Sequence, residues 1–204
     1  MAIEFKESKT RENLMRAFAG ESQARNRYTI AAETAKKQGM YAISQIFLFT
    51  ADQEKAHAER FYDLLKNLSG TSIAIEGSYP VDHFDSVTEL LKAAHHNEME
   101  EFEDVYPAFA EVARGEGFLE AAATFAQIAE IEKVHGKRFE KVAELLEENR
   151  YYESENETKW MCLNCGYIHE GKMVPMICPV CRHERGYFIP ASLAPYLEMG
   201  LWGK

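Results

Sequence analysis

One four-residue pattern, Glu-x-x-His, occurs twice in this sequence, 78 residues apart. The first copy is formed by Glu54 and His57, and the second by Glu132 and His135. Both copies lie in stretches with helical periodicity, where residues three apart share one face of the helix. Each helix therefore directs a carboxylate and an imidazole to the same point. Two such helices facing each other could hold two metal ions, which favours a redox enzyme over a plain helical bundle.

The pattern belongs to a longer internal repeat with the same offset, which indicates one helical hairpin used twice. Gly39 and its counterpart Gly117 are expected at the two turns, because glycine readily adopts the left-handed conformation that ends a helix. Other matched pairs include three aromatic ones: Tyr28 with Tyr106, Phe47 with Phe125, and Phe61 with Phe139.

We predict four helices, at about residues 10–37, 41–67, 86–114 and 118–149. Ser86 is expected to cap the third helix, and Pro107 to bend it or distort one of its turns. The first and last connections are short, so each pair of helices is antiparallel. The middle connection of about 16 residues can extend about 50 Å, more than the length of a helix of about 27 residues. It either crosses back along the bundle, as in a ferritin-like four-helix bundle, or loops out.

Acidic residues on the other two helices complete a candidate metal site. Glu21 falls within the apolar stripe of the first helix, and Glu98 and Glu101 lie three apart on the third. Ferritin-like di-iron sites combine one Glu from each of two helices with a Glu-x-x-His from each of the others. Without metal, such converging carboxylates would cost several kcal/mol each, and oxygen donors with imidazoles suit iron or manganese. The alternative, a solvated helix face, explains one copy of the pattern better than two in register.

All four cysteines lie in a short segment near the end of the chain. They form two Cys-x-x-Cys pairs, Cys162 with Cys165 and Cys178 with Cys181. This spacing predicts a tetrahedral four-thiolate metal site rather than disulfides. A zinc ribbon is the common alternative, and the cage alone does not distinguish zinc from iron. Gly166, Tyr167 and Pro179 around the pairs favour a single iron that cycles by one electron.

Composition and charge set further bounds on the function. A net charge of −10 argues against nucleic acid as the main partner. No apolar run approaches the roughly 20 residues that span a bilayer, so we expect a cytoplasmic protein without a membrane partner. Residues 150–159 are polar and read as a solvated linker. We therefore predict a mainly α chain with a helical bundle at 1–149, a linker at 150–159 and a small metal-binding domain at 160–204.

Taken together, these motifs resemble those of the rubrerythrins over nearly the whole chain. Such proteins join a ferritin-like di-iron domain to a C-terminal rubredoxin-like iron domain. The resemblance rests on Gly20-Glu21-Ser22-Gln23-Ala24, Glu98-x-x-Glu101, both Glu-x-x-His motifs and both cysteine pairs. It implies that Glu54 and Glu132 bridge two irons, that Glu21 binds one of them, and that Glu98 with His135 binds the other.

The resemblance also assigns roles to four further residues. Glu101 and His57 are similar to a pair that alternates, with the carboxylate bound in the oxidised state and the imidazole in the reduced state. Tyr28 and Tyr106 resemble phenols that hydrogen-bond to ligand carboxylates, and plain core packing is the less favoured alternative.

The function implied is a peroxidase that reduces hydrogen peroxide to water. It would use two irons in the bundle and one in the cysteine site, with electrons from a separate rubredoxin or NAD(P)H flavoprotein reductase. Family resemblance also suggests a homodimer. One alternative is a ferroxidase or iron-handling protein of ferritin type. Another is a bundle that uses a zinc ribbon to dock partner proteins.

Overall fold

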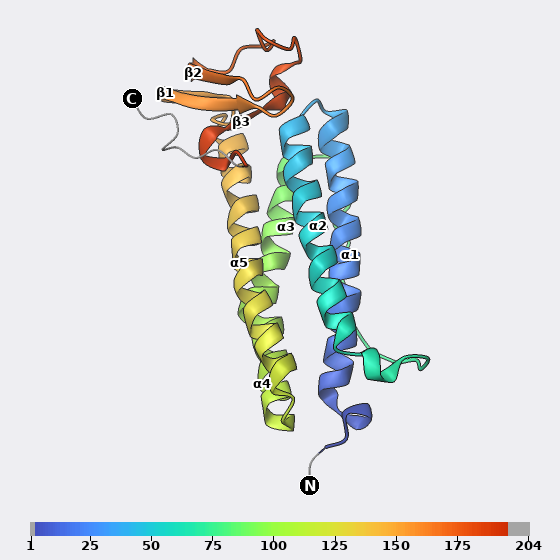
Figure 1. The fold of residues 1–204 in the computed structure, drawn as a ribbon. Helices are drawn as coiled ribbons and strands as arrows, with labels where there is room; N and C mark the ends of the chain where they lie inside the picture. The colour runs from blue at the N-terminus through green and yellow to red at the C-terminus, as the bar shows by residue number, and fades with distance from the viewer. Residues whose placement is uncertain (1–2, 196–204) are drawn as a thin grey trace.

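The computed structural model of the chain describes residues 3–195. Residues 1–2 and 196–204, which belong to the predicted N- and C-terminal domains, lie outside the described part. Four long helical rods run side by side, and a small sheet covers one end of them (Figure 1). The rods are α1 (Lys9–Lys37), α2 (Tyr41–Asp63), the succession α3 (Val87–Glu100), η3 (Glu101–Val105) and α4 (Tyr106–Glu116), and α5 (Leu119–Glu147).

One glycine ends the first helix of each hairpin. Gly39 has φ +75° and Gly117 has φ +89°, so both adopt the predicted left-handed conformation. The residue after each glycine donates its N–H to a carbonyl five residues earlier: Met40 to Ala35 O at 2.9 Å, and Phe118 to Ala113 O at 2.9 Å. These bonds satisfy carbonyls that the helix end leaves free. The two turns therefore share one geometry, as the internal repeat predicts.

The connection between α2 and α3 crosses the length of the bundle. After a short 3₁₀ turn, η2 (Lys66–Leu68), residues 69–86 contain no regular helix or strand and climb along α1 toward the sheet end (Figure 1). α3 therefore starts near the end where α2 starts, and the two run parallel. Ser86 caps α3 by accepting a hydrogen bond from the Glu89 N–H at 3.4 Å. The predicted single crossover and its cap are both confirmed.

The third rod contains one turn of π-helix, η3, which ends at Val105, two residues before Pro107. Proline has no N–H and clashes with the carbonyl four residues earlier, so the ordinary α-helical bond pattern is broken there. A π turn holds one more residue than an α turn. The distortion expected at Pro107 is therefore one inserted residue. It rotates the side chains of α3 by about 100° around the helix axis relative to those of α4.

Two apolar clusters fill the bundle interior above and below its middle. In one, Phe47 of α2 packs on Phe139 of α5, with ring centroids 5.3 Å apart. In the other, Phe61 of α2 packs on Phe125 of α5 at 5.1 Å. All four rings are fully buried. They are related by the repeat, so the same aromatic pair closes the core on both sides of the bundle's centre.

The C-terminal part is a three-stranded antiparallel sheet in the order β2-β1-β3. Its strands are β1 (Glu153–Cys162), β2 (Ile168–Met173) and β3 (Phe188–Pro190). Short 3₁₀ turns, η4 (Arg185–Tyr187) and η5 (Ala191–Leu193), flank β3, and η1 (Phe5–Glu7) precedes α1. The Tyr187 ring stacks on that of Tyr41 at 4.2 Å between centroids, which seats the sheet on the turn between α1 and α2.

The segment predicted as a solvated linker, residues 150–159, has a different structure. β1 already begins at Glu153, and Tyr151 is buried against the end of the helical core. Most side chains of residues 153–158 are nevertheless exposed, which explains the polar composition. The division at residues 149 and 160 itself stays a prediction. Across residues 3–195, no helix is long and apolar enough to cross a membrane.

Candidate metal centres

Buried carboxylates and imidazoles meet at the middle of the helical bundle. They form two groups, in each of which the potential ligand atoms lie within 4.8 Å of one another. Glu54 of α2 and Glu132 of α5 belong to both groups, so each can reach two metal positions. All members are buried, and they come from all four rods. One group is Glu21, Glu54, His57 and Glu132, and the other is Glu54, Glu98, Glu132 and His135.

Each imidazole points its Nδ1 atom at the carboxylates. His57 Nδ1 lies 2.9 Å from Glu132 Oε1 and 3.1 Å from Glu54 Oε2. His135 Nδ1 lies 2.8 Å from Glu132 Oε2, 3.0 Å from Glu54 Oε1 and 3.3 Å from Glu98 Oε2. The two rings are nearly parallel, with centroids 5.6 Å apart. One nitrogen thus faces each half of the carboxylate cluster.

The buried polar atoms of this cluster fit a pair of metal ions. Within the described part of the chain, buried oxygens of Glu21, Glu54, Glu98 and Glu132 and both ring nitrogens of His135 lack a hydrogen-bond partner with suitable geometry. Leaving even one such group unsatisfied costs about 1–3 kcal/mol. Carboxylate oxygens with one imidazole on each side are donors that suit iron or manganese. A cation at each position would satisfy these atoms and cancel their charge.

Two tyrosines donate hydrogen bonds to the single acids, Glu21 and Glu98. The Tyr106 hydroxyl donates to Glu21 Oε1, and the Tyr28 hydroxyl donates to Glu98 Oε1. Burial, followed by the nearby carboxylate, raises the pKa of each phenol well above its usual value. The phenols therefore stay protonated and remain donors. Each tyrosine donates to the acid of the other hairpin: Tyr28 of the first hairpin to Glu98 of the second, and Tyr106 of the second to Glu21 of the first.

Glu21 and Glu98 are 77 residues apart, one less than the offset of the repeat, and the π turn accounts for this difference. Glu21 precedes Tyr28 by seven residues, whereas Glu98 precedes Tyr106 by eight. Seven residues bring a side chain back to the same face of an α-helix, and eight overshoot that face by about 80°. The extra residue in η3 absorbs this difference. Both acids consequently reach equivalent positions in the cluster.

Glu101, the additional acid in η3, lies outside both groups. It is partly exposed, and burial followed by the charges of Glu98, Glu132 and Glu54 raises its pKa well above the usual value. Of the two side chains predicted to alternate, His57 thus lies among the carboxylates and Glu101 beside them. Six of the seven predicted helical ligands converge, and Glu101 is their neighbour.

The pKa shifts predict how a metal-free protein responds to pH. Although burial alone would lower the pKa of both imidazoles, Glu132 and Glu54 raise that of His57 to about 9 and that of His135 to about 12. Burial also raises the carboxyl pKa values of Glu21 and Glu98. The folded state then binds protons that the unfolded state has released. Stability from His57 is full below pH 6.5 and lost as the pH rises through about 9.

We therefore expect chelator-treated protein to lose stability between about pH 6.5 and 9, by on the order of 3 kcal/mol from His57 alone. Metal-loaded protein should not show this loss, because its ligands are already deprotonated. Urea unfolding across this pH range, with and without bound metal, measures both slopes. A metal-free protein whose stability is constant or rises over the range would contradict the expectation.

The four cysteines form a second centre beside the sheet. Their Sγ atoms all lie within 4.8 Å of one another, with Cys162 and Cys181 3.7 Å apart and Cys165 and Cys178 3.8 Å apart. Both pairs have one backbone geometry, since the residue four positions after the first cysteine donates its N–H to that cysteine's carbonyl. The backbone N–H of His183 lowers the pKa of the Cys181 thiol to about 5. This cage is consistent with a rubredoxin-type iron.

Comparisons with known proteins agree with both centres. The family model for rubrerythrin matches residues 12–143, and the one for the rubredoxin-like domain of rubrerythrins matches residues 160–189. Rubrerythrin-1 of Clostridium acetobutylicum is 49% identical over 185 residues, which cover 90% of this chain and 94% of the relative. The rubrerythrin of Porphyromonas gingivalis is 46% identical and covers 91% of each chain.

Solved structures show the same architecture. A structure of nigerythrin in a mixed-valence state superposes with a TM-score of 0.60 at 30% identity, over 90% of this chain and 89% of the other. The bacterioferritin BfrA of Mycobacterium tuberculosis has a TM-score of 0.60 over 72% of this chain and 90% of its own, but at 18% identity this likeness concerns the fold alone. The predicted ferritin-like bundle with a small C-terminal domain is confirmed. The chain belongs to the rubrerythrin family of di-iron proteins with a rubredoxin-like iron centre.

Proposed function

We propose that this chain is a peroxidase that reduces hydrogen peroxide to water. One observation carries the proposal: a buried pair of metal positions that share Glu54 and Glu132 lies in the same chain as a four-thiolate cage. The pair suits a two-electron reaction, and the cage suits one-electron transfer. A protein that only stores iron has no need of a fused electron-transfer centre.

Each predicted ligand has a place in this proposal. Glu54 and Glu132 would be shared by the two metals, because they alone belong to both groups. Glu21 would hold one metal, and Glu98 with His135 would hold the other. His57 and Glu101 would be the alternating ligands of the first metal, the imidazole in the reduced protein and the carboxylate in the oxidised protein. The position of His57 among the carboxylates and of Glu101 beside them supports an exchange between these two side chains.

The reaction consumes one hydrogen peroxide, two protons and two electrons and yields two water molecules. When bound, the metal pair supplies the two electrons and polarises the oxygen–oxygen bond. The protein supplies a dry interior, closed by the two buried aromatic pairs. Tyr28 and Tyr106 each donate a hydrogen bond to one oxygen of Glu98 and Glu21, respectively, so these acids keep their orientation as the charge of the site changes.

We propose that Cys162, Cys165, Cys178 and Cys181 would hold an iron that supplies one-electron transfer, with electrons from a separate rubredoxin or NAD(P)H flavoprotein reductase. The sheet sits at the Tyr41 end of α2, whereas Glu54 is thirteen residues further along, about 20 Å at 1.5 Å per residue. This separation within one chain supports a homodimer in which the cage of one protomer lies near the helical site of its partner.

The test is a single turnover without oxygen. We expect fully reduced protein, mixed anaerobically with hydrogen peroxide, to become oxidised by two electrons per peroxide within seconds. Stopped-flow absorbance and a titration of electrons per peroxide measure this. Oxidation by dioxygen alone would refute the peroxidase. Uptake of iron beyond the two helical positions and the cysteine cage would instead support a ferroxidase.

A further inference from the structure

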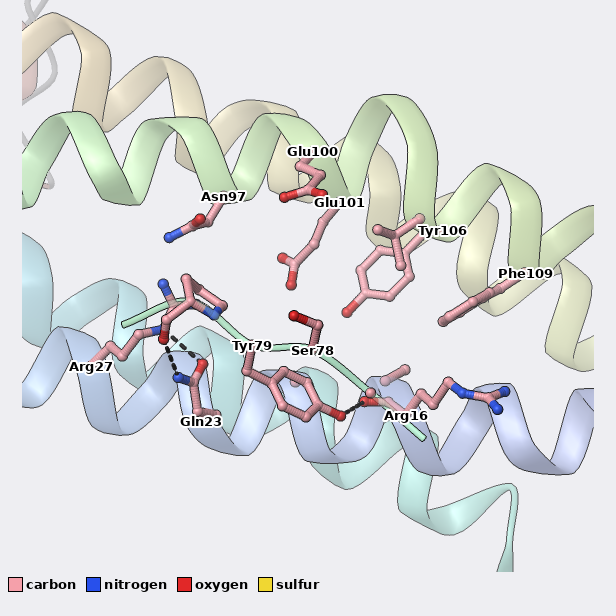
Figure 2. Close-up of a pocket in the computed structure, with 15 residues that line it drawn as sticks. Arg16, Gln23, Arg27, Ser78, Tyr79, Asn97, Glu100, Glu101, Tyr106 and Phe109 are labelled. Atoms are coloured by element: carbon pink, nitrogen blue, oxygen red, sulfur yellow. Dashed lines mark hydrogen bonds between the residues drawn. The ribbon is translucent and has the colours of Figure 1, made fainter. Parts of the chain in front are cut away.

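An open cleft of about 230 Å³ lies beside the helical metal site, between α1, η3 and the crossover. Figure 2 shows the Glu101 carboxylate and the Tyr106 hydroxyl pointing down from η3 and α4, toward the Ser78 hydroxyl on the crossover. Gly20 of α1 forms part of the opposite wall. Gly20 directly precedes Glu21, and Glu101 is three residues after Glu98. The cleft therefore approaches both single acids of the metal site.

The solvent exposure of the predicted ligand side chains indicates that the helical metal site is most open on the side of this cleft. Glu21, Glu54, Glu98, Glu132 and His135 are each at most 1% exposed. Glu101 is partly exposed and lines the cleft. The remaining predicted ligand, His57, is 8% exposed on α2 and does not line the cleft. A molecule that enters the cleft from solvent therefore meets Glu101 before the other predicted ligands.

Hydrogen bonds to α1 and α3 hold the crossover in place along this cleft. At one end, Arg16 Nε donates to the Glu76 carbonyl at 2.9 Å, and the Tyr79 hydroxyl donates to the Arg16 carbonyl at 3.2 Å. The Tyr79 ring then covers Gly20, where an added β-carbon would lie 3.7 Å from the ring. These contacts fix the outer wall of the cleft.

At the other end, the crossover is tied to α1 and α3 through one carboxylate. Asp82 accepts from Arg27 at 2.8 Å and from Asn97 at 2.7 Å. Gln23 donates to the Pro80 carbonyl at 3.0 Å. Arg27 and Asn97 are the sequence neighbours of Tyr28 and Glu98. Both ends of the cleft are therefore closed by contacts to the crossover, and of the predicted ligands Glu101 lines it.

We propose that this cleft is the route by which a small polar oxidant reaches the metal site, and that Gly20 and Ser78 keep it open. Gly20 and Ser78 both line the cleft together with Glu101, and neither fills it with a large side chain. In Figure 2 the small Ser78 side chain faces the Glu101 carboxylate. That the oxidant is hydrogen peroxide rests on the proposed function. The route itself does not, because any small metal ligand would take it.

The experiment narrows the cleft from two opposite walls. Gly20→Leu places a side chain beneath Tyr79, and Ser78→Phe places one before Glu101 from a segment that contributes no predicted ligand. Gly115→Leu is the matched control, because Gly115 lies in α4 with no atom within 4 Å of an added β-carbon. The probe is azide, a small linear anion whose binding to the oxidised, metal-loaded protein is followed by visible absorption.

We expect both narrowing variants to bind azide more slowly, by on the order of tenfold, while Gly115→Leu binds at the wild-type rate. Metal content should remain that of the wild type. An unchanged azide rate in metal-loaded Ser78→Phe would overturn the proposal and place access elsewhere, such as beside His57. If wild-type protein is not oxidised by peroxide, the peroxidase assignment fails, and the azide rates still decide the route.

A narrowing variant that loses metal cannot be used to measure azide binding. In that case a variant that widens the cleft tests the proposal instead. Tyr79→Ala removes the ring over Gly20 together with the hydroxyl that holds Arg16. We expect azide to bind this variant several-fold faster than the wild type. In that case a wild-type or slower rate in Tyr79→Ala overturns the proposal.

Discussion

Glu132→Gln is expected to remove the dinuclear centre while leaving the cysteine-bound metal in place. Glu132 belongs to both ligand groups, is fully buried, and has one oxygen beside each imidazole. Glutamine has the same shape but carries no charge and only one oxygen, so it cannot bridge two cations. We expect loss of at least one helical metal and a fall in the rate of oxidation by peroxide of at least ~100-fold.

The control for this variant lies on the same helix. Glu130→Gln makes the same chemical change two residues earlier, at an exposed position of α5. Metal analysis should give wild-type values for Glu130→Gln and one metal or none in the bundle for Glu132→Gln. The absorption of the cysteine-bound iron is the internal reference in both. Two helical metals and wild-type peroxide kinetics in Glu132→Gln would show that Glu132 is not a bridge.

Much of the helical framework follows from sequence periodicity. The offset of 78 residues places Glu54 and Glu132 in equivalent positions, and the left-handed turns at Gly39 and Gly117 are as predicted. Converging acids and imidazoles on four helices also predict the buried cluster. These features depend on local spacing, for which the 3.6-residue period is a sufficient guide.

The inserted residue in the third rod shows where periodicity is insufficient. Glu21 shifted by 78 residues falls on Met99, not on Glu98, so the sequence contains the mismatch. Pro107 marks the distorted turn, but proline is compatible with a kink, a break or a π turn. Only the fold selects the π turn, because it alone brings both Glu98 and Tyr106 to the interior. The reciprocal phenol contacts depend on that choice.

Two other features are set by tertiary contacts rather than by pattern. The first half of β1 is exposed and polar, so its composition resembles that of a linker. The cleft is formed by a crossover without helical or strand periodicity, held by contacts such as Arg27 with Asp82 that lie 55 residues apart. Hydrophobic patterning carries no information about either feature.

Cys162→Ser is expected to stop sustained turnover but not the reaction of the helical site itself. Cys162 is fully buried at the end of β1, with its Sγ 3.7 Å from that of Cys181. Replacing one of four thiolates removes the soft ligand set that iron requires. Peroxide consumption driven by NAD(P)H and a reductase should fall at least ~100-fold, because the one-electron centre is lost.

Single-turnover oxidation of chemically reduced Cys162→Ser should match that of the wild type. Val180→Ser, an exposed substitution between the second pair of cysteines, should retain both activities and serves as the control. Sustained turnover by Cys162→Ser at the wild-type rate would mean that electrons reach the helical site without the cage. The proposed role of the C-terminal domain would then be wrong.

Combining the two inactive variants tests whether electrons cross between protomers. A Cys162→Ser chain keeps its helical site, and a Glu132→Gln chain keeps its cysteine cage. If the cage of one protomer serves its partner, a mixed dimer contains one working pair of centres. An equal mixture of freely exchanging protomers should then recover about a quarter of wild-type turnover, since half of its dimers are mixed. A path within one chain predicts no recovery, because each chain then lacks one of its own two centres. The roughly 20 Å of α2 between Tyr41 and Glu54 favours recovery.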